Sequence, residues 1–201
     1  YQPCAALAPS ATMAEATIPG PSLGASAVAS LLREAPGALT NDAVVFDAVA
    51  RFYEAQKCQP AWTGETSARL VECVSKVAEL GLNPKDYLPP EPDPSAPAEG
   101  GDALARRDVA LTAGFFELAR DLMVGRALPP ADPPAAQWQP AVPDLVPELQ
   151  ASLASGDLAG RLAGLEPTWD GYVALKGALK RYREIAAAGG WPDVPYIGPA
   201  A

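Results

Sequence analysis

The chain has 201 residues, about the length of one domain. Hydrophobic residues make up 49% of it and charged residues 19%, which is enough apolar material for a packed core and excludes disorder over most of the length. The formal net charge of −9 has the wrong sign for a nucleic-acid surface and disfavours an anionic membrane surface. No apolar run approaches the roughly 20 residues that cross a bilayer.

The first half of the chain predicts an arm followed by three helices. Residues 1–24 are rich in Pro, Ala, Ser and Gly without a period, which indicates an extended or disordered arm. Helical texture runs over residues 25–34, and a second helix begins after the N-cap candidates Thr40-Asn41-Asp42 and ends before Pro60. A third helix is predicted after Thr66-Ser67, with Gly81 as its C-cap glycine. The expected apolar faces are Val45, Val49, Phe52 and Gln56, widened by Phe46 and Tyr53, and then Leu70, Cys73 or Val74, Val77 and Leu80.

The second half predicts three further helices between proline-rich connections. Residues 82–88 indicate a turn or a short helical turn, and residues 89–101 a proline-dense loop. The most regular helix covers residues 103–124, with Leu104, Leu111, Phe115, Leu118 and Leu122 on its apolar face. After a second proline-rich stretch, residues 129–147, we expect a short helix over 148–155 and a last helix over 171–188 that carries Tyr172, Leu175, Leu179 and Tyr182 on one face. No segment alternates like a strand, so the sequence predicts an all-α domain, an irregular bundle of six or seven helices with long Pro-rich connections.

The residue types available for catalysis are few. The chain has no histidine, which excludes Ser–His and Cys–His nucleophile pairs and His-containing metal sites within it. It also has no P-loop and no G-x-G-x-x-G motif. The remaining carboxylates are interpreted as solvated loop residues (Glu91, Asp93, Glu99), helix caps (Asp42, Asp102), or members of a solvated face with local ion pairs (Glu117 and Asp121 with Arg120). We therefore expect no catalytic, cofactor-binding or metal-binding residue.

The three cysteines, Cys4, Cys58 and Cys73, lack the C-x-x-C spacing of zinc or redox motifs. One interpretation makes them small buried apolar residues. The other pairs Cys58 with Cys73 in an oxidising compartment, across a separation of 15 residues, a cross-link worth roughly 3 kcal/mol. Cys4 would then be the odd thiol. The start at Tyr1 is not a signal peptide, and we interpret it as a processed or trimmed product.

Aromatic residues fall into two groups. Phe52, Tyr53, Trp62, Phe115 and Phe116 lie on helix stripes or just beyond them and are expected in the core. Trp138 and Trp191 lie beside prolines outside the predicted helices. These two are candidate surface aromatic contacts for a glycan or a partner protein, although we favour a role in pinning a loop onto the bundle.

Four short segments carry a family resemblance. They are Phe52–Thr63 (FYEAQKCQPAWT), Gly81–Tyr87 (GLNPKDY), Leu118–Arg126 (LARDL followed by GR), and residues 172–195, which hold Tyr172, Leu175, Leu179, Tyr182 and the sequence GWPDVP. In this order they resemble the helical scaffold domain of large periplasmic L,D-transpeptidases of the YcbB type. The resemblance covers about residues 42–195.

This resemblance implies a scaffold role without catalysis. In such enzymes a peptidoglycan-binding module follows the helical scaffold, and a later domain cross-links peptidoglycan stems with a cysteine and a histidine in an SHGC-x-R-like motif. None of the three cysteines here stands in that context, and Cys58 stands where the family often has an aromatic residue. The resemblance thus implies no enzyme activity and no cofactor for these residues.

Two functional readings remain open. The first is a scaffold domain over residues 25–195 that positions catalytic and peptidoglycan-binding modules for cell-wall remodelling, with residues 196–201 starting a linker to a further module. The second is a free-standing periplasmic interaction subunit of an envelope assembly, in which residues 1–24 and 129–147 wrap a partner. Both imply the periplasm of a Gram-negative bacterium and peptidoglycan or envelope proteins as partners. A membrane anchor ahead of Tyr1 and the oligomeric state stay open.

Overall fold

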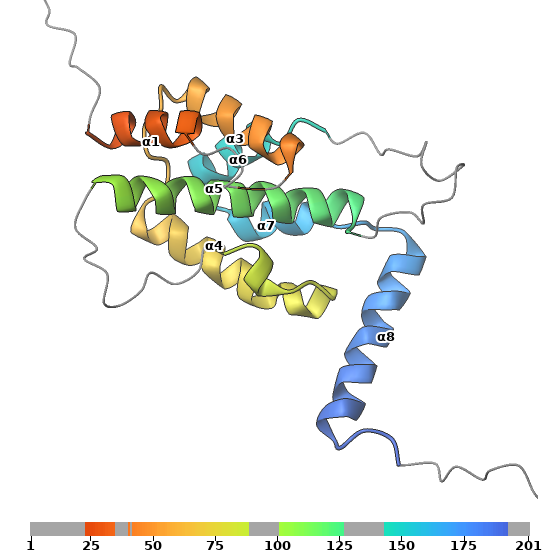
Figure 1. Cartoon of the computed structure of the whole chain (residues 1–201). Helices are drawn as coiled ribbons and strands as arrows, with labels where there is room; N and C mark the ends of the chain where they lie inside the picture. The colour runs from red at the N-terminus through yellow and green to blue at the C-terminus, as the bar shows by residue number, and fades with distance from the viewer. Residues whose placement is uncertain (1–22, 35–39, 41, 89–100, 127–142, 193–201) are drawn as a thin grey trace, which may run out of the picture.

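The computed structural model describes residues 23–34, 40, 42–88, 101–126 and 143–192, and this part of the chain contains helices and no strand (Figure 1). The all-α class is confirmed. The seven α-helices of the described part are α1 (Leu23–Glu34), α3 (Ala43–Ala55), α4 (Gly64–Lys76), α5 (Gly101–Val124), α6 (Val146–Ser155), α7 (Leu158–Gly164) and α8 (Asp170–Ala187). Two 3-10 turns, η1 (Val77–Leu80) and η2 (Pro84–Asp86), follow α4.

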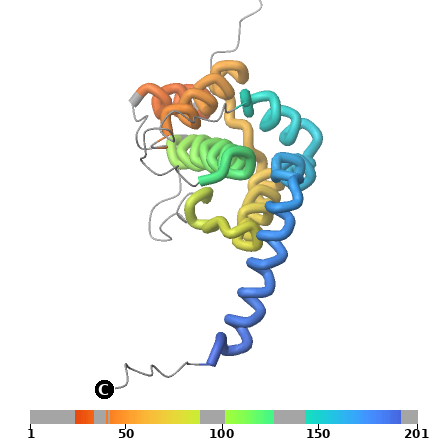
Figure 2. The backbone as a smooth tube through the Cα atoms, turned by 90° about the vertical axis from the view of Figure 1, so that its right-hand side faces the viewer, coloured from red at the N-terminus to blue at the C-terminus, as the bar shows by residue number. Residues whose placement is uncertain are grey.

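Helix α5 is the centre of the body. Helices α1, α3 and α4 contact it directly. Helix α6 packs on α3, α7 packs on α4, and α6 and α7 contact each other (Figures 1 and 2). Its buried residues therefore lie on several faces, among them Ala105, Asp108, Val109, Leu111, Thr112, Ala113, Phe115, Phe116, Leu118, Ala119, Asp121 and Leu122. The single apolar face predicted for this helix is wrong in extent, and Leu104, assigned to that face, is 68% exposed. A helix covered on more than one side needs small and hydrogen-bonded polar residues where its neighbours approach.

The predicted aromatic core is confirmed. Phe52, Tyr53, Phe115 and Phe116 are fully buried, while Trp62 is half-buried at the edge of the core. The Phe52 ring meets both Tyr53 and Phe116 edge to face, with centroids 5.2 and 6.2 Å apart. This arrangement of rings joins α3 to α5.

Helix ends follow local capping chemistry. Asp42 caps α3, as predicted, by accepting hydrogen bonds from the amides of Val44 and Val45. Helix α4 begins earlier than predicted, at Gly64, because Thr63 is its N-cap and forms a capping box with Thr66. Asp102 was predicted as a cap, but α5 begins at Gly101 and places Asp102 in its first turn.

Some of the predicted helix ends are confirmed, and one helix of the structure was not predicted. Gly81 ends η1 in the left-handed conformation with φ of +84°, and the predicted helical turn is η2. Helix α7, capped by Asp157, was not predicted because its seven residues are too few for a periodic signal. The predicted arm and linker lie outside the described residues, except that Leu23 and Gly24 belong to α1.

Helix α8 extends away from the rest of the molecule and meets it at η1 (Figures 1 and 2). None of its residues is buried. Trp191, favoured above as a residue that pins a loop onto the bundle, is 61% exposed and lies against Tyr182 of α8 instead. Among the described helices none is both long and apolar enough to cross a membrane.

Candidate functional site

A buried carboxylate, Asp108, holds the α3–α4 connection against α5. It is only 5% exposed. Its oxygens accept the Tyr53 hydroxyl at 2.5 Å, the Ala61 amide at 3.0 Å and the Trp62 amide at 2.9 Å. Thr112, one turn further along α5, accepts the Trp62 indole N–H at 2.9 Å and contacts the Tyr53 hydroxyl at 2.8 Å. We call these five residues the Asp108 cluster.

The Asp108 cluster has the features of a structural site. Both carboxylate oxygens are engaged by donors that stay in place, so neither is available to take a proton from a substrate. Burial, and after it the charge of Asp108, raises the pKa of the Tyr53 hydroxyl above its ordinary value. Tyr53 is therefore a fixed hydrogen-bond donor at neutral pH and neither a base nor a nucleophile.

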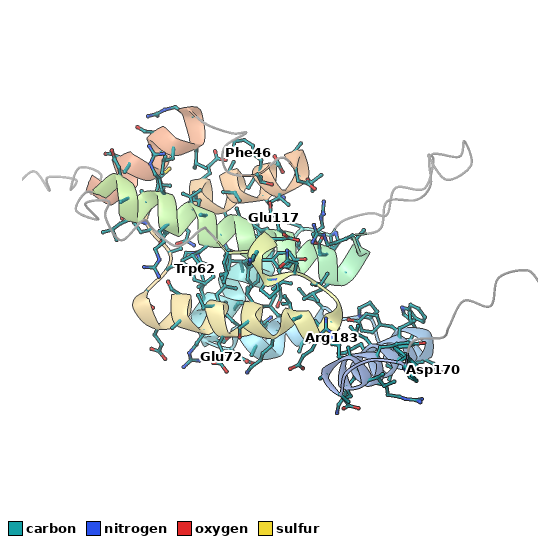
Figure 3. The ribbon with its side chains drawn as sticks, turned by 60° about the horizontal axis from the view of Figure 1, so that its bottom comes forward. Phe46, Trp62, Glu72, Glu117, Asp170 and Arg183 are labelled. Carbon is teal, nitrogen blue, oxygen red and sulfur yellow. The ribbon has the colours of Figure 1, made fainter. Side chains whose placement is uncertain are left out.

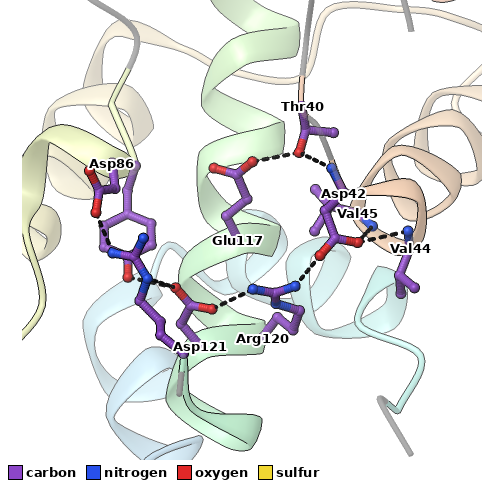
Figure 4. Close-up of polar contacts among 10 residues, drawn as sticks. Thr40, Asp42, Val44, Val45, Asp86, Glu117, Arg120 and Asp121 are labelled. Carbon is purple, nitrogen blue, oxygen red and sulfur yellow. Dashed lines mark hydrogen bonds and ion pairs between the residues drawn. The ribbon is translucent and has the colours of Figure 1, made fainter. Parts of the chain in front are cut away.

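A second polar cluster surrounds Arg120 on the opposite end of α5 (Figure 4). The Arg120 guanidinium pairs with Asp42, the N-cap of α3, and donates to Asp121 at 2.8 Å. One turn earlier on α5, Glu117 accepts the Thr40 hydroxyl at 2.6 Å. The chain that leads into α3 is thus tied to α5 by two separate contacts.

The same cluster also holds η2. Tyr87 is buried, and its hydroxyl donates to Asp121 at 2.8 Å. Arg126, just beyond the end of α5, pairs with Asp86 and lies 3.4 Å from Asp121 (Figure 4). Asp121 therefore joins η2, Arg120 and Arg126. We call this set, with Thr40, Asp42 and Glu117, the Arg120 cluster.

The interpretation of Glu117, Arg120 and Asp121 as a solvated face is wrong. Asp121 is 7% exposed, and Glu117 and Arg120 are half-buried. Arg120 and Asp121 form the one local ion pair of the three, and their other partners come from outside α5. The reason is that α3 and η2 cover this end of α5, so charged residues there must be paired. Sequence periodicity could not reveal this, because it assigns charged positions to the surface.

The segments that carry the family resemblance meet in these clusters. Tyr53, Ala61 and Trp62 of the first segment bind Asp108. Asp86 and Tyr87 of the second segment bind Arg126 and Asp121 of the third. The part of the fourth segment that the structure describes, residues 172–192, contains most of α8 and the exposed Tyr182 and Trp191. Three of the four segments thus maintain the fold, and the fourth lies on the surface.

Glu117 makes stability depend on pH. Its pKa is raised, chiefly by burial and further by the charges of Asp121 and Asp42, against the opposing effects of Thr40 and Arg120. Between the unfolded pKa and this higher folded pKa the native state binds more protons, so stability falls as pH rises through that window. Tyr87 has a raised pKa as well, because of burial and its hydrogen bond to Asp121.

We expect Glu117→Gln to remove this pH dependence. Glutamine keeps an acceptor for Thr40 but cannot ionise, so the variant should equal or exceed the native protein in stability at pH 7. The advantage should vanish below the unfolded pKa of Glu117, about 4.3, where the native residue is protonated too. Urea unfolding at several pH values from 4 to 8 measures both effects. The measured quantity is the stability of the variant minus that of the native protein. If this difference is smaller at pH 7 than at pH 4, the raised pKa assigned to Glu117 is contradicted.

A groove opens between α4, η1, α5, α7 and the start of α8. Its volume is about 590 Å³, and its floor is apolar, formed by Cys73, Val77, Leu80, Leu118, Leu122, Leu158 and Leu162. Three ion pairs lie at its rim, Arg69 with Glu65, Lys76 with Glu72 and Lys176 with Glu166, and Glu79 and Asp157 also line it. No group of His, Cys, Asp and Glu residues in the described part of the chain could hold a metal ion.

The structure places some of the remaining candidates. Cys58 and Cys73 are free thiols in the structure, which therefore does not contain the disulfide that one of the two interpretations above would form. Cys58 lies in the left-handed turn after α3 with φ of +57°, whereas Cys73 faces the groove beside α7. Burial raises the pKa of the Cys73 thiol, which lowers its reactivity. Cys4 and Trp138 lie outside the described residues.

Comparison with known protein families gives a match over most of the described helices. A family model described as Scaffold domain matches residues 47–179, more than half of the 201 residues. The match begins in α3 and ends in α8, so it includes the Asp108 cluster and most of the Arg120 cluster. No curated protein and no solved structure matches the chain. The chain belongs to the Scaffold domain family.

Proposed function

We propose that this domain is the non-catalytic helical scaffold of an L,D-transpeptidase, which positions catalytic and peptidoglycan-binding modules for remodelling of the cell wall. The proposal places the domain in the periplasm of a Gram-negative bacterium. Its partners are then peptidoglycan and the modules that act on it.

One observation carries this proposal: two of the four segments that resemble the transpeptidase scaffold bind each other. Asp86 and Tyr87 on one side and Asp121 and Arg126 on the other come from two separate segments of the resemblance, and they bind each other. Such pairing is expected if the segments were retained together for the same fold. It is not expected of four unrelated short matches.

The chemistry of the described residues supports a scaffold over an enzyme. The buried carboxylates Asp108 and Asp121 are each engaged by protein donors. Cys73, half-buried, has a raised pKa, and the chain has no histidine to activate a cysteine. The packed α-helical body and the projecting α8 suit a module that holds others in place.

The polypeptide as it exists in its native source tests the proposal. We expect an intact mass well above the 20.8 kDa of these residues, with peptides from a module that contains a catalytic cysteine and histidine. That whole polypeptide should cross-link peptidoglycan stem peptides, and the 201-residue chain alone should not.

A different result would favour the other reading. A native mass near 20.8 kDa, in a particle that contains other envelope proteins and no transpeptidase, would make the chain a free-standing interaction subunit. Cross-linking activity of the isolated chain would overturn both readings.

A further inference from the structure

Helix α8 carries an apolar stripe whose large side chains are mostly exposed. Leu175 and Tyr182 are 65% and 60% exposed, and Ala178 and Ile185 continue the same face at spacings of three and four residues. Trp191 extends the stripe beyond the helix, since its ring lies 5.5 Å from that of Tyr182 and is 61% exposed. We call these five residues the α8 stripe.

The contacts of α8 with the body lie on another side of the helix. Lys176 and Tyr172 both reach Glu166, and Leu179 approaches Gly81 at the end of η1. At 100° per residue these positions lie roughly a quarter turn from the centre of the α8 stripe. Figure 3 shows α8, with Asp170 at its N-terminal end, apart from the other helices. The α8 stripe is therefore open to a partner.

The exposed apolar area of the α8 stripe indicates a binding surface. Leu175, Tyr182 and Trp191 are each about three-fifths exposed, which leaves roughly 400 Å² of largely apolar side-chain surface in one patch. Patches of this size on monomers are often binding sites. A helix of 18 residues without a buried residue also lacks the tertiary packing that normally stabilises helices in proteins.

Charge indicates the chemistry of that partner. Helix α8 contains Lys176, Lys180, Arg181 and Arg183 against Asp170 and Glu184, a net charge of +2 in a chain of −9. Lys180, Arg181 and Arg183 are exposed and form no ion pair with any residue that the structure describes. At 100° per residue, Arg181 borders one edge of the α8 stripe, and Arg183 lies further from the other edge, about 80° from Leu175. A partner with carboxylates beside an apolar ridge complements this pattern.

The same charges weigh against two other occupants. A second copy that paired α8 with α8 would bring the basic edges together, and like charges across an interface are unfavourable. An anionic membrane would attract α8 but repel the remainder of this acidic chain. We propose that the α8 stripe docks an acidic helix of a neighbouring module. The inference deepens the proposed scaffold function by naming the surface and the chemistry of its partner.

Two designed helical peptides test the charge and the stripe together. Both carry leucines at heptad positions, one with glutamates and the other with lysines at the flanking positions, and their binding to the full chain is measured by fluorescence anisotropy. We expect the glutamate peptide to bind at least tenfold more tightly than the lysine peptide, with an affinity that falls as salt rises. The double variant Leu175→Ser, Tyr182→Ser should lose at least tenfold in affinity.

Val173→Ser is the matched control. Val173 is 59% exposed on the far side of α8, so its loss should leave the affinity unchanged. Circular dichroism verifies that all variants remain helical.

Equal binding of the two peptides, or binding of neither, would overturn the proposal. Self-association in sedimentation equilibrium that Leu175→Ser abolishes would assign the stripe to a second copy instead. Tighter binding to phosphatidylglycerol vesicles than to the glutamate peptide would assign it to a membrane. None of these readouts depends on transpeptidase activity, so the native-mass experiment can succeed or fail separately.

Discussion

Gly114→Ala is expected to destabilise the domain by at least about 3 kcal/mol, the upper part of the range for overpacked cores. Gly114 lies in the middle of α5, against the backbone of Tyr87 at the end of η2. A Cβ atom at this position would stand 1.8 Å from the backbone oxygen of Tyr87, a clash that a side-chain rotation cannot relieve. Relief would require η2 to move away from α5, and the Tyr87–Asp121 hydrogen bond of 2.8 Å would then lengthen or break.

Gly177→Ala provides the control for this prediction. Gly177 lies in the interior of α8, and no atom stands within 4 Å of a Cβ built on it. Because alanine favours helix over glycine, this change should leave stability unchanged or raise it by up to about 1 kcal/mol. Thermal melts compare the two variants, and a loss of 3 kcal/mol corresponds to roughly 6–12 °C for a domain of this size. A Gly114→Ala protein that melts with the native one would refute the close packing of η2 on α5.

Most of the helices could be predicted from the sequence because they are long and periodic. The apolar spacing in α3 and α5 and the cap at Asp42 are local signals, and the structure contains them. The short α7 gives no such signal, and the start of α4 was placed late because Thr66 belongs to the capping box with Thr63. These differences are local and do not change the fold class.

The polar clusters could not be predicted from periodicity. Asp108 and Asp121 are charged residues in an amphipathic helix, and such positions normally face water. They are buried here because segments distant in sequence, the Ala61–Trp62 turn and η2, cover them. The family resemblance marked some of the residues involved, among them Trp62, Tyr87 and Asp121, but it did not include Asp108 and did not show which residues touch. The exposure of α8 could not be predicted from the sequence for a related reason. An apolar stripe has the same residue spacing whether it packs against its own domain or against another one.

Asp108→Asn is expected to cost on the order of 2–4 kcal/mol, because buried donors left without an acceptor cost about 1–3 kcal/mol each. The two carboxylate oxygens serve the Tyr53 hydroxyl and the amides of Ala61 and Trp62. Asparagine has nearly the same shape but replaces one acceptor by an NH₂ group, which would face those N–H donors. Tyr53 retains Thr112 at 2.8 Å, so the backbone amides should bear most of the loss.

The location of that loss separates a specific role of Asp108 from general damage to α5. Hydrogen exchange should show reduced protection of the Ala61 and Trp62 amides in Asp108→Asn, beyond the change in global stability measured by urea unfolding. Asp102→Asn, an exposed substitution of the same kind in the first turn of α5, should cost less than about 1 kcal/mol, the size of a helix-dipole effect. Equal losses in the two variants, or unchanged protection of the two amides, would mean that Asp108 does not hold the α3–α4 connection. Unchanged protection of the Ala61 and Trp62 amides would mean that packing of Trp62 on α5 holds this connection. The first segment would then resemble the family through its aromatic residues alone.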